Sequence, residues 1–541
     1  GPSEVKHKRG KTIYKTFQAT AEYNKTIGGH TFGILAGYSW EQEDYRYVQG
    51  SRDKFPGNDL PYLNAGSPDN QKSEGTGNAW AIQSGFGRLR YNFNERYLFE
   101  STVRYDGSSR FPQSKKFGFF PSVAAGWRLS EENFFKENES LGFISNLKLK
   151  VSWGRLGNQN IGNYPYQSVY ELGQNYPFGD TYTQGAAVTT AVDPTIKWEE
   201  TETIDGGLEA VFWNGLLSVN ASYFNRRTYD ILYKPSGSVS TILGQKISEM
   251  NTGELKNFGW EFEVGHRNKI GDVSYNVNAN LSIIKNKLTT LGVGNVEQLN
   301  GMVGNGSDLF IGYPIQMYYG YVSDGVFLDE NDIKSWYDQS KVTPNPQPGD
   351  IRYKDISGPD GVPDGKIDPN YDRVYLGSRI PKFTFGLNLG VEYKGLDLSV
   401  LLQGVAGVTG MLDGFAGWAF RGDGNIQKWQ AEGRFDPANP TRYPAYPRLE
   451  DLSNSTTPNI VTSDFWTQDA SYIRLKNIQL GYTFPKKMLQ AAKISNLRVY
   501  VQAENPLCWN KYKPGWDPEI NTSGNYYPIL ATYTFGVNFK F

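Results

Sequence analysis

Four carboxylates fall within one short stretch rich in glycine and proline: Asp355, Asp360, Asp364 and Asp368. Closely spaced aspartates supply the oxygen ligands that Ca²⁺ prefers, and Gly365 stands directly after the third of them, as in half of a calcium-binding loop. Pro359 and Val362, however, occupy places where further oxygen ligands would be needed, and no bidentate glutamate ends the stretch. Aspartate, glycine and proline are also the residues of tight turns. The pattern therefore favours a cluster of turns, with a Ca²⁺ cofactor as the alternative.

Aromatic side chains beside charges and amides form a second candidate site, for binding rather than catalysis. They lie in two long segments, 156–198 and 407–437, and the candidates for contact with a substrate are Asn158, Tyr164, Trp418, Phe420, Arg421 and Asp423. Aromatic rings offer flat apolar surfaces and the polar groups offer hydrogen bonds, which suits a sugar and a peptide equally. The same residues also suit packing of one loop on another, or docking of a protein partner.

Residues that would support catalysis are sparse. The three histidines, His7, His30 and His266, have no ligand spacing to a cysteine or to one another, which argues against a zinc site. No nucleophile elbow or phosphate-binding loop occurs. Glu261 and Glu263 have the spacing of one strand face, which favours a solvated surface over an acid–base pair. The sequence therefore predicts that the protein is not an enzyme.

Composition separates this chain from ordinary soluble domains. Of its 541 residues only 38% are hydrophobic, whereas 15% are aromatic and 60 are glycine. The 55 basic and 56 acidic residues balance, so no nucleic-acid-binding surface is expected. Low apolar content with many aromatics suits a membrane barrel that has a polar lumen and aromatic girdles. No apolar run approaches the roughly 20 residues of a membrane helix. Residues 1–10 contain no signal peptide, so an exported chain of this kind is expected to be a mature fragment.

The end of the chain shows the strand pattern most clearly. Aromatic and apolar residues alternate there with small or polar ones, at Tyr533, Phe535, Val537, Phe539 and Phe541, which is the period of a strand with one apolar face. A closed membrane barrel can end in this way, because its last strand pairs with another strand and its aromatic face meets lipid. Segments 273–283 and 383–393 alternate similarly, and 258–267 places charges on its second face. A β-sandwich would bury those charges at a prohibitive cost, whereas a wide barrel exposes them to water.

This pattern predicts about fifteen strands, near 12–24, 30–43, 79–92, 96–106, 117–129, 146–155, 199–213, 216–228, 256–267, 271–285, 381–393, 396–406, 471–484, 496–505 and 531–541. Short turns alternate with long loops, which are predicted at 44–78, 156–198, 229–255, 286–380, 407–470 and 506–530. Outer-membrane barrels show this asymmetry, with short periplasmic turns and long extracellular loops. In an odd ladder the first and last strands run in the same direction and cannot pair antiparallel. Closure is therefore expected to need an odd number of further strands on the N-terminal side.

Several stretches resemble the SusC/RagA-like class of TonB-dependent outer-membrane transporters. They include 97–111, which contains the run Tyr105-Asp106-Gly107-Ser108-Ser109-Arg110-Phe111, and 121–129, which reads Pro-Ser-Val-Ala-Ala-Gly-Trp-Arg-Leu. The other stretches are 147–158, 348–372, 463–482 and the terminal strand. Each match is weak by itself, but together they occur in order over nearly the whole chain.

The resemblance implies an all-β transmembrane antiparallel barrel of about 22 strands with a plugged lumen, in the outer membrane of a Gram-negative, Bacteroidetes-like bacterium. It implies an importer of oligosaccharides or oligopeptides, energised through TonB, with a SusD-like surface lipoprotein as its lid. The chain departs from the family pattern because it has no plug domain, TonB-contact box or first strands. These are expected on a separate N-terminal chain of the same transporter. The resemblance also implies that the barrel assembly machinery reads a terminal signal, formed by Tyr533, Phe535, Phe539 and Phe541.

Two other functions fit parts of the pattern. A passive outer-membrane porin would share the barrel but would need no plug. A secreted glycan-binding β protein would share the aromatic loops, but it would extract without detergent.

Overall fold

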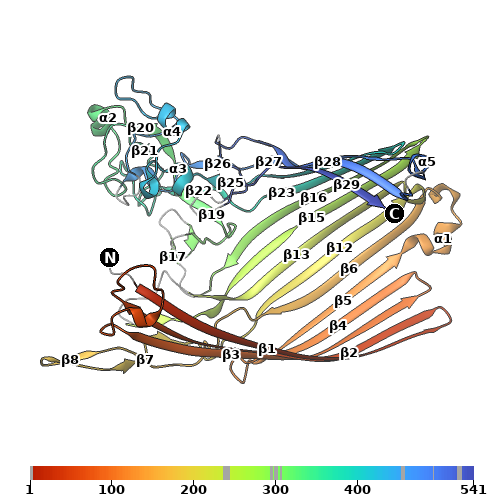
Figure 1. Ribbon diagram of the computed structural model, residues 1–541, viewed down its shortest axis with the longest axis horizontal. Coiled ribbons are helices and arrows are strands. Elements are labelled where there is room, and N and C mark those ends of the chain that lie inside the picture. The colour runs from red at the N-terminus through yellow and green to blue at the C-terminus, as the bar shows by residue number, and fades with distance from the viewer. Residues whose placement is uncertain are drawn as a thin grey trace.

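The computed structural model of the protein describes residues 4–234, 244–292, 296–297, 302–304, 308–451, 457–490, 493–513, 515–520 and 527–541. Fifteen strands form one antiparallel sheet in which the hydrogen-bonded neighbours follow chain order (Figure 1). They are β1 (Glu4–Ile27), β2 (His30–Asp53), β3 (Lys72–Phe93), β4 (Tyr97–Ser108), β5 (Phe117–Arg128), β6 (Ile144–Asn158), β12 (Glu199–Phe212), β13 (Leu217–Tyr233), β15 (Met250–Ile270), β16 (Val273–Thr290), β23 (Phe383–Tyr393), β24 (Leu396–Ala406), β27 (Tyr472–Thr483), β28 (Asn496–Asn510) and β29 (Thr532–Lys540). The prediction of an all-β barrel wall with fifteen strands is confirmed.

The remaining elements are short and lie in the connections between these strands. Seven small strand pairs occur in the described residues: β7 (Glu171–Leu172) with β10 (Ala186–Ala187), β8 (Tyr176–Phe178) with β9 (Thr181–Thr183), β11 (Thr190–Ala191) with β14 (Lys246–Ile247), β17 (Val296–Glu297) with β18 (Val303–Gly304), β19 (Met317–Tyr321) with β22 (Arg373–Ser378), β20 (Ser323–Val326) with β21 (Ile351–Tyr353), and β25 (Thr409–Met411) with β26 (Thr467–Asp469). The α-helices are α1 (Asn133–Lys136), α2 (Glu330–Ser335), α3 (Gly414–Gly417), α4 (Lys428–Gly433) and α5 (Lys486–Leu489). Within the described chain no helix has the length and apolar character needed to cross a membrane.

The two faces of the sheet differ in chemistry, because side chains alternate along every strand. The register places Phe262 beside Ala221 and Leu281, and Leu281 beside Phe385, so one apolar face continues across four strands. The opposite face carries Glu263 beside Asn220 and Asn280. An apolar outer face in contact with lipid and a polar inner face in contact with water are the two surfaces of a transmembrane barrel.

Short turns and long connections lie at opposite ends of the sheet (Figure 1). The turn between β1 and β2 consists of Gly28 and Gly29, and the φ of Gly28 is 58°, a backbone conformation that glycine adopts without strain. The connections after β2, β6, β16 and β24 are long and gather at the other end. The short turn at Gly28 and these long connections therefore lie at opposite ends of the described sheet, and the extracellular position of the long ones remains a prediction.

The first strands are longer than the sequence pattern predicts. The strand predicted at 12–24 begins at Glu4, β2 continues to Asp53 and β3 begins at Lys72, so about half of the loop predicted at 44–78 is strand. Similarly, β13 extends to Tyr233 and β28 to Asn510, which shortens the loops predicted at 229–255 and 506–530. Beyond the lipid-facing band both faces of the wall meet water, so neither face of a strand has to be apolar, while the backbone hydrogen bonds continue. The alternation of apolar and polar residues therefore ends before the strands end.

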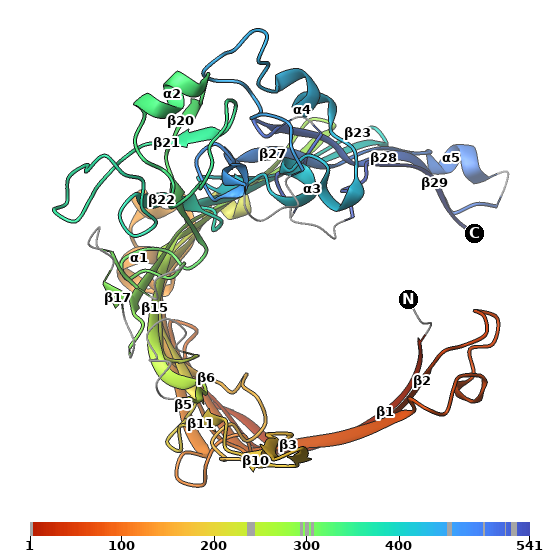
Figure 2. The ribbon, with the colours of Figure 1, turned by 90° about the vertical axis from the view of Figure 1, so that its left-hand side faces the viewer.

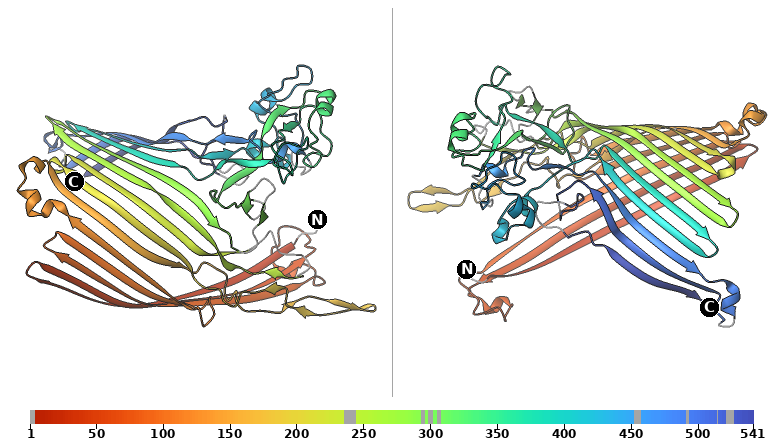
Figure 3. Two further views of the ribbon diagram at one scale, coloured as in Figure 1. Left: turned by 180° about the vertical axis from the view of Figure 1, so that it is seen from behind. Right: turned by 90° about the horizontal axis from the view of Figure 1, so that it is seen from above.

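The sheet curves around a central space and remains open between β1 and β29 (Figures 2 and 3). Among the described residues, β1 pairs only with β2, and β29 pairs only with β28. Both edge strands run toward the end that carries the short turns, because β1 leads into the turn at Gly28 and β29 ends beside Asn496. The edges are therefore parallel and cannot pair antiparallel with each other.

Candidate functional site

The inner face of the sheet carries paired charges that bridge neighbouring strands. Arg90 of β3 reaches Glu22 of β1 across β2 at 2.8 Å, and Lys148 and Lys150 of β6 lie 3.2 and 3.0 Å from Glu209 of β12. Such half-exposed pairs contribute only about 0–1 kcal/mol each. They show instead that this inner face is polar, as the lumen lining of a transmembrane barrel is.

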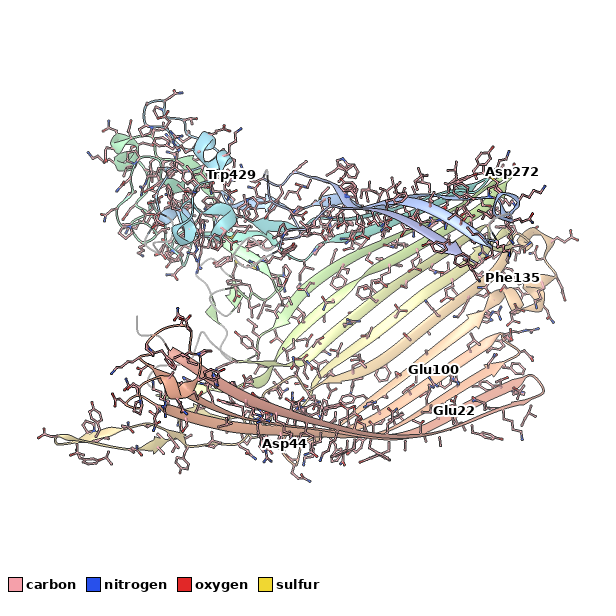
Figure 4. All side chains as sticks on the ribbon, viewed as in Figure 1. Glu22, Asp44, Glu100, Phe135, Asp272 and Trp429 are labelled. Carbon is pink, nitrogen blue, oxygen red and sulfur yellow. The ribbon has the colours of Figure 1, made fainter. Side chains whose placement is uncertain are left out.

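A groove of about 600 Å³ lies on this inner face, toward the end with the short turns. Small residues make room for it at Gly33, Ala124 and Gly126, and charged side chains line it at Arg90, Glu100, Lys148, Lys150 and Asp205. Figure 4 shows Glu22 and Glu100 on this part of the wall. The groove opens into the central space enclosed by the sheet.

The long connections fold into a separate body on the opposite rim, which we call the rim lobe. It is built from the described residues of 316–378, 408–470 and 510–517, and it stands over the side of the sheet formed by β23, β24, β27 and β28 (Figures 1 and 2). Its buried core consists of Tyr321, Val326, Ile351, Tyr353, Ile367, Leu412, Ala416, Ala419, Phe435, Tyr446, Trp466, Ala470 and Tyr512. Described parts of the loops predicted at 286–380 and 407–470 therefore pack on each other. Such packing was one of three roles that the sequence left open, beside substrate binding and docking of a partner.

Backbone and side-chain hydrogen bonds join the two halves of the rim lobe. The Tyr321 N–H donates to the carbonyl of Thr462 at 3.0 Å, and the Ser323 N–H donates to Asp464 at 2.7 Å. The Trp466 indole, 1% exposed, donates to the Asn459 carbonyl at 2.7 Å. A buried polar group without a partner would be costly. The bonds of Tyr321 and Ser323 each join residues 141 positions apart and hold the two halves in one arrangement, whereas the Trp466 bond lies within the second half.

Two buried ion networks lie in the rim lobe. Arg352 donates to Asp332 at 3.0 Å and pairs with Asp324, while its guanidinium lies 3.6 Å from the centre of the Trp336 ring. Arg442 completes this network by pairing with Asp332. Burial opposes ionisation of Asp332, but hydrogen bonds from Arg442 and from a backbone N–H bring its pKa below the ordinary value.

The second network surrounds the fully buried Asp350. Arg448 donates to it at 2.5 Å and Asn459 at 2.9 Å. Burial nevertheless raises the pKa of Asp350 above its usual range. This carboxylate joins segment 347–351 to Arg448 and Asn459, which is a structural role.

The substrate-binding candidates of the second long segment lie on the surface of the rim lobe. Trp418 packs against the lobe core, and the Arg421 guanidinium lies 5.2 Å from the centre of its ring. Phe420 is 38% exposed and has a φ of 56°, which is rare for a bulky residue. The indole N–H of Trp418 is buried and has no hydrogen-bond partner among the described residues. The side chain of Asp423 lies outside the described residues.

The two remaining candidates, Asn158 and Tyr164, belong to a different part of the rim. Asn158 donates to Glu199 at 3.1 Å, and Tyr164 contacts Tyr166, whose ring lies 6.4 Å away. Tyr166 packs on a second buried cluster made of Phe111, Phe120, Ile161, Ile196 and Trp198. The structure thus places Trp418, Phe420 and Arg421 on the rim lobe and Tyr164 beside the second cluster, whereas Asn158 is exposed and bonded to Glu199. Whether any of the six candidates contacts substrate remains a prediction.

The aspartate-rich stretch forms a network of turns. Asp355 accepts a hydrogen bond from the Gly365 N–H at 2.5 Å, Asp364 accepts one from the Lys366 N–H at 3.1 Å, and Asp368 pairs with Lys341. Asp360 is exposed. The centre of the network is Asp372, which sequence reasoning did not single out. It is fully buried and accepts the N–H groups of Ile356, Ser357 and Asp368.

These contacts use the carboxylates as acceptors for the chain itself. In the part of the chain that the structure describes, no three His, Cys, Asp or Glu side chains are arranged to hold a metal ion. Burial, opposed by these backbone hydrogen bonds, raises the pKa of Asp372, and the nearby charge of Asp355 adds to the effect. Calcium binding at this stretch remains a prediction.

The terminal strand β29 presents its aromatic face outward. Tyr533, Phe535 and Phe539 lie on the apolar face, which continues that of Val501 on β28, and Phe541 follows the last strand residue and is 80% exposed. The Ser495 hydroxyl donates to the Lys540 carbonyl at 2.9 Å and to that of Phe541 at 3.2 Å. The side chains are therefore free to contact lipid or protein, and their role in assembly remains a prediction.

Comparison with known proteins agrees with this architecture. The family model "TonB dependent receptor-like, beta-barrel" matches residues 5–505. TonB-dependent receptor P3 of Formosa agariphila is 28% identical over 96% of this chain and 51% of its own length. TonB-dependent receptor SusC of Bacteroides thetaiotaomicron is 28% identical over 98% of this chain and 50% of its own.

Solved structures show the same fold. The RagAB peptide importer in its open-open state aligns with a TM-score of 0.78 and 25% identity, over 99% of this chain and 56% of that one. The chain spans about half the length of the curated relatives it matches. The family consists of receptors and transporters of the Gram-negative outer membrane and not of enzymes, so the predicted class and location are confirmed. The chain belongs to the TonB-dependent receptor-like β-barrel family.

Proposed function

We propose that this chain forms most of the barrel wall of an active outer-membrane importer of the SusC type, which takes up oligosaccharides or oligopeptides. The observation that carries the proposal is the fifteen-stranded wall, with its polar inner face and its long connections on one rim. This wall aligns with SusC in sequence and with the RagAB importer in structure. A charged inner face surrounds a water-filled or plugged lumen and suits passage of polar nutrients.

The proposal includes an N-terminal part that carries a plug and closes the barrel between β1 and β29. The two edge strands are parallel, so an odd number of antiparallel strands fits between them. The matched relatives are about twice as long as this chain, which leaves room for such a part. TonB would then transmit energy to the plug. A structure of the complete transporter should show an odd number of closing strands, and an even number would refute this part of the proposal.

A SusD-like surface lipoprotein is the proposed lid, and the rim lobe is its proposed docking surface. The rim lobe is a packed body with buried ion networks, so it can present a fixed surface to a partner. Aromatic side chains at its surface, including Phe415 at 48% exposure, suit anchors of a protein interface.

The importer is tested by uptake measurements with the complete transporter in its native outer membrane. Cells that carry the transporter should accumulate labelled oligosaccharides or oligopeptides, and deletion of TonB should abolish this accumulation. A tagged transporter should also co-purify with a surface lipoprotein. Uptake that continues at the same rate without TonB would support a passive porin and overturn the proposal.

A further inference from the structure

The extracellular half of β1 to β3 carries a set of aromatic and acidic side chains on the inner face of the wall. Cross-strand neighbours form successive rows there: Gly10, Tyr47 and Thr76; Thr12, Tyr45 and Asn78; Tyr14, Glu43 and Trp80; Thr16, Glu41 and Ile82. The β1–β2 and β2–β3 pairings contain no register shift, so these rows share one face with Glu22 and Arg90. We call this surface the β1–β3 platform.

The platform stands above the lipid-facing band. On the outer face of β2, apolar residues run from Phe32 to Trp40, and beyond them Gln42, Asp44 and Arg46 are polar. The rows from Thr16 to Gly10 lie at and beyond this change. Neighbouring rows on one face are about 7 Å apart and paired strands about 5 Å apart, so the four rows make a flat surface of small-molecule size.

Hydrogen bonds and ring contacts fix the side chains of the platform relative to one another. The Tyr14 hydroxyl donates to Glu41 at 2.6 Å, and the Tyr14 ring lies 6.4 Å from that of Trp80. The rings of Tyr45 and Tyr47 are 6.1 Å apart, and the Tyr45 ring lies over Gly10, where a Cβ atom would meet it at 3.2 Å. Tyr14 is 52% exposed, and the other three rings are half-buried, so they offer faces to the lumen.

The charges on the platform balance. Glu41 and Glu43 are opposed by two cations that lie against its rings: the Arg110 guanidinium is 5.2 Å from the centre of the Trp80 ring, and the Lys8 amine is 3.9 Å from that of Tyr47. Arg110 is also held in place by the carbonyls of Gln159 and Ile161, at 3.2 and 2.9 Å. A surface with equal numbers of acids and bases favours an uncharged ligand.

We propose that the β1–β3 platform is a binding surface for a neutral oligosaccharide. The C–H faces of sugar rings stack on the flat faces of Tyr and Trp, and sugar hydroxyls donate to carboxylates and accept from amides. Tyr14, Tyr45 and Trp80 supply the rings, and Glu41, Glu43 and Asn78 supply polar partners. A peptide that binds by strand addition needs a free strand edge. β2, at the centre of the platform, offers none because it is bonded on both sides, so among the described strands only the outer edges of β1 and β3 could take such a peptide.

This inference rests on the proposed importer and names its cargo class and contact surface. The test uses the complete transporter in detergent and measures binding by isothermal titration calorimetry. The probes are maltohexaose, cellohexaose, xylohexaose and mannohexaose, and a tryptic digest of casein serves as the peptide probe. The variants are Trp80→Ala and Tyr45→Ala. The matched control is Tyr182→Ala, a ring that is 77% exposed on the β8–β9 hairpin.

At least one hexasaccharide should bind, and each platform variant should weaken that binding roughly 10-fold or more, because a stacked ring is an anchor that alanine removes. Tyr182→Ala should leave the affinity unchanged. Heat-resistant migration of the barrel should be the same in all variants.

Three results would overturn the assignment: no hexasaccharide binds, only the peptides bind, or the platform variants bind sugars as tightly as Tyr182→Ala does. The importer is judged separately by its dependence on TonB. TonB-dependent uptake with unaffected platform variants would refute the platform and leave the importer standing. Uptake without TonB would refute the importer, while sugar binding to the platform could still be measured.

Discussion

Asp332 is the residue on which the first ion network of the rim lobe converges. It accepts hydrogen bonds from Arg352 at 3.0 Å and from the Leu328 N–H at 2.9 Å, and it pairs with Arg442. Folding lowers its pKa, because these hydrogen bonds outweigh burial. The charged carboxylate therefore stabilises the lobe above about pH 4, and this stabilisation is lost as pH falls through the lower folded-state pKa.

Asp332→Asn should destabilise the rim lobe by about 1–3 kcal/mol, because the buried Arg352 loses part of its compensating charge. Hydrogen–deuterium exchange of 321–353 at neutral pH should accelerate, and the difference from the wild type should shrink at acid pH. The control is Glu432→Gln, since Glu432 pairs with Lys428 at 3.7 Å on the exposed surface. That change should cost less than about 0.5 kcal/mol. Equal exchange in both variants would contradict this role for Asp332.

Asp372 provides a test that distinguishes a cluster of turns from a Ca²⁺ site in the aspartate-rich stretch. Its three backbone hydrogen bonds do not need a cation, so removal of Ca²⁺ by a chelator should leave proteolysis of 355–372 unchanged. Asp372→Asn should accelerate that proteolysis, because it weakens acceptors for three buried N–H groups. Protection that disappears with the chelator and returns with added Ca²⁺ would favour the calcium interpretation instead.

At the scale of elements, sequence predicts a strand well where its two faces meet different environments. β16 and β29 alternate between apolar and polar residues because one face contacts lipid and the other contacts the lumen. At Lys6, His7 and Lys8 both faces of β1 meet water, and the periodic signal is absent. The same reasoning explains the platform: Tyr14, Glu43 and Trp80 lie on three strands, and only the register brings them together.

The aromatic face of β29 can be tested by removing its last ring. Deletion of Phe541 should lower the amount of assembled protein in the outer membrane without changing transport per molecule, since the exposed aromatic face of β29 is the proposed assembly signal. Quantitative blotting of membrane fractions measures the first effect, and uptake normalised to that amount measures the second. Asn538→Ala, on the inner face of the same strand, should assemble normally. Normal levels of the Phe541 deletion would count against the signal.

At the scale of the whole molecule, the rim lobe is what the sequence could not reveal. Its core joins Tyr321 and Tyr353 to Tyr446 and Trp466, and no local period marks residues that meet across a hundred positions. The sequence singled out Trp418 and Phe420 as candidates for substrate contact, but it could not show that Leu412, Ala416 and Ala419 around them are core. Replacing 409–430 as a block would therefore unfold the lobe, and it would not test the surface alone.

The docking surface needs a variant that spares this core. Phe415→Ser combined with Phe420→Gly removes two exposed rings, which are 48% and 38% exposed, and glycine adopts the φ of 56° at position 420 without strain. If the lid docks on the rim lobe, the amount of lipoprotein that co-purifies with this variant should fall at least about 10-fold. The lobe should resist proteolysis as it does in the wild type. Phe134→Ser serves as the control, because Phe134 is 60% exposed on α1 at the opposite end of the barrel.

Trp466→Ala, which empties the lobe core at a cost of about 3–5 kcal/mol, should lose both the lid and protease resistance. Full retention of the lid by the surface variant would show that these rings only shield the barrel.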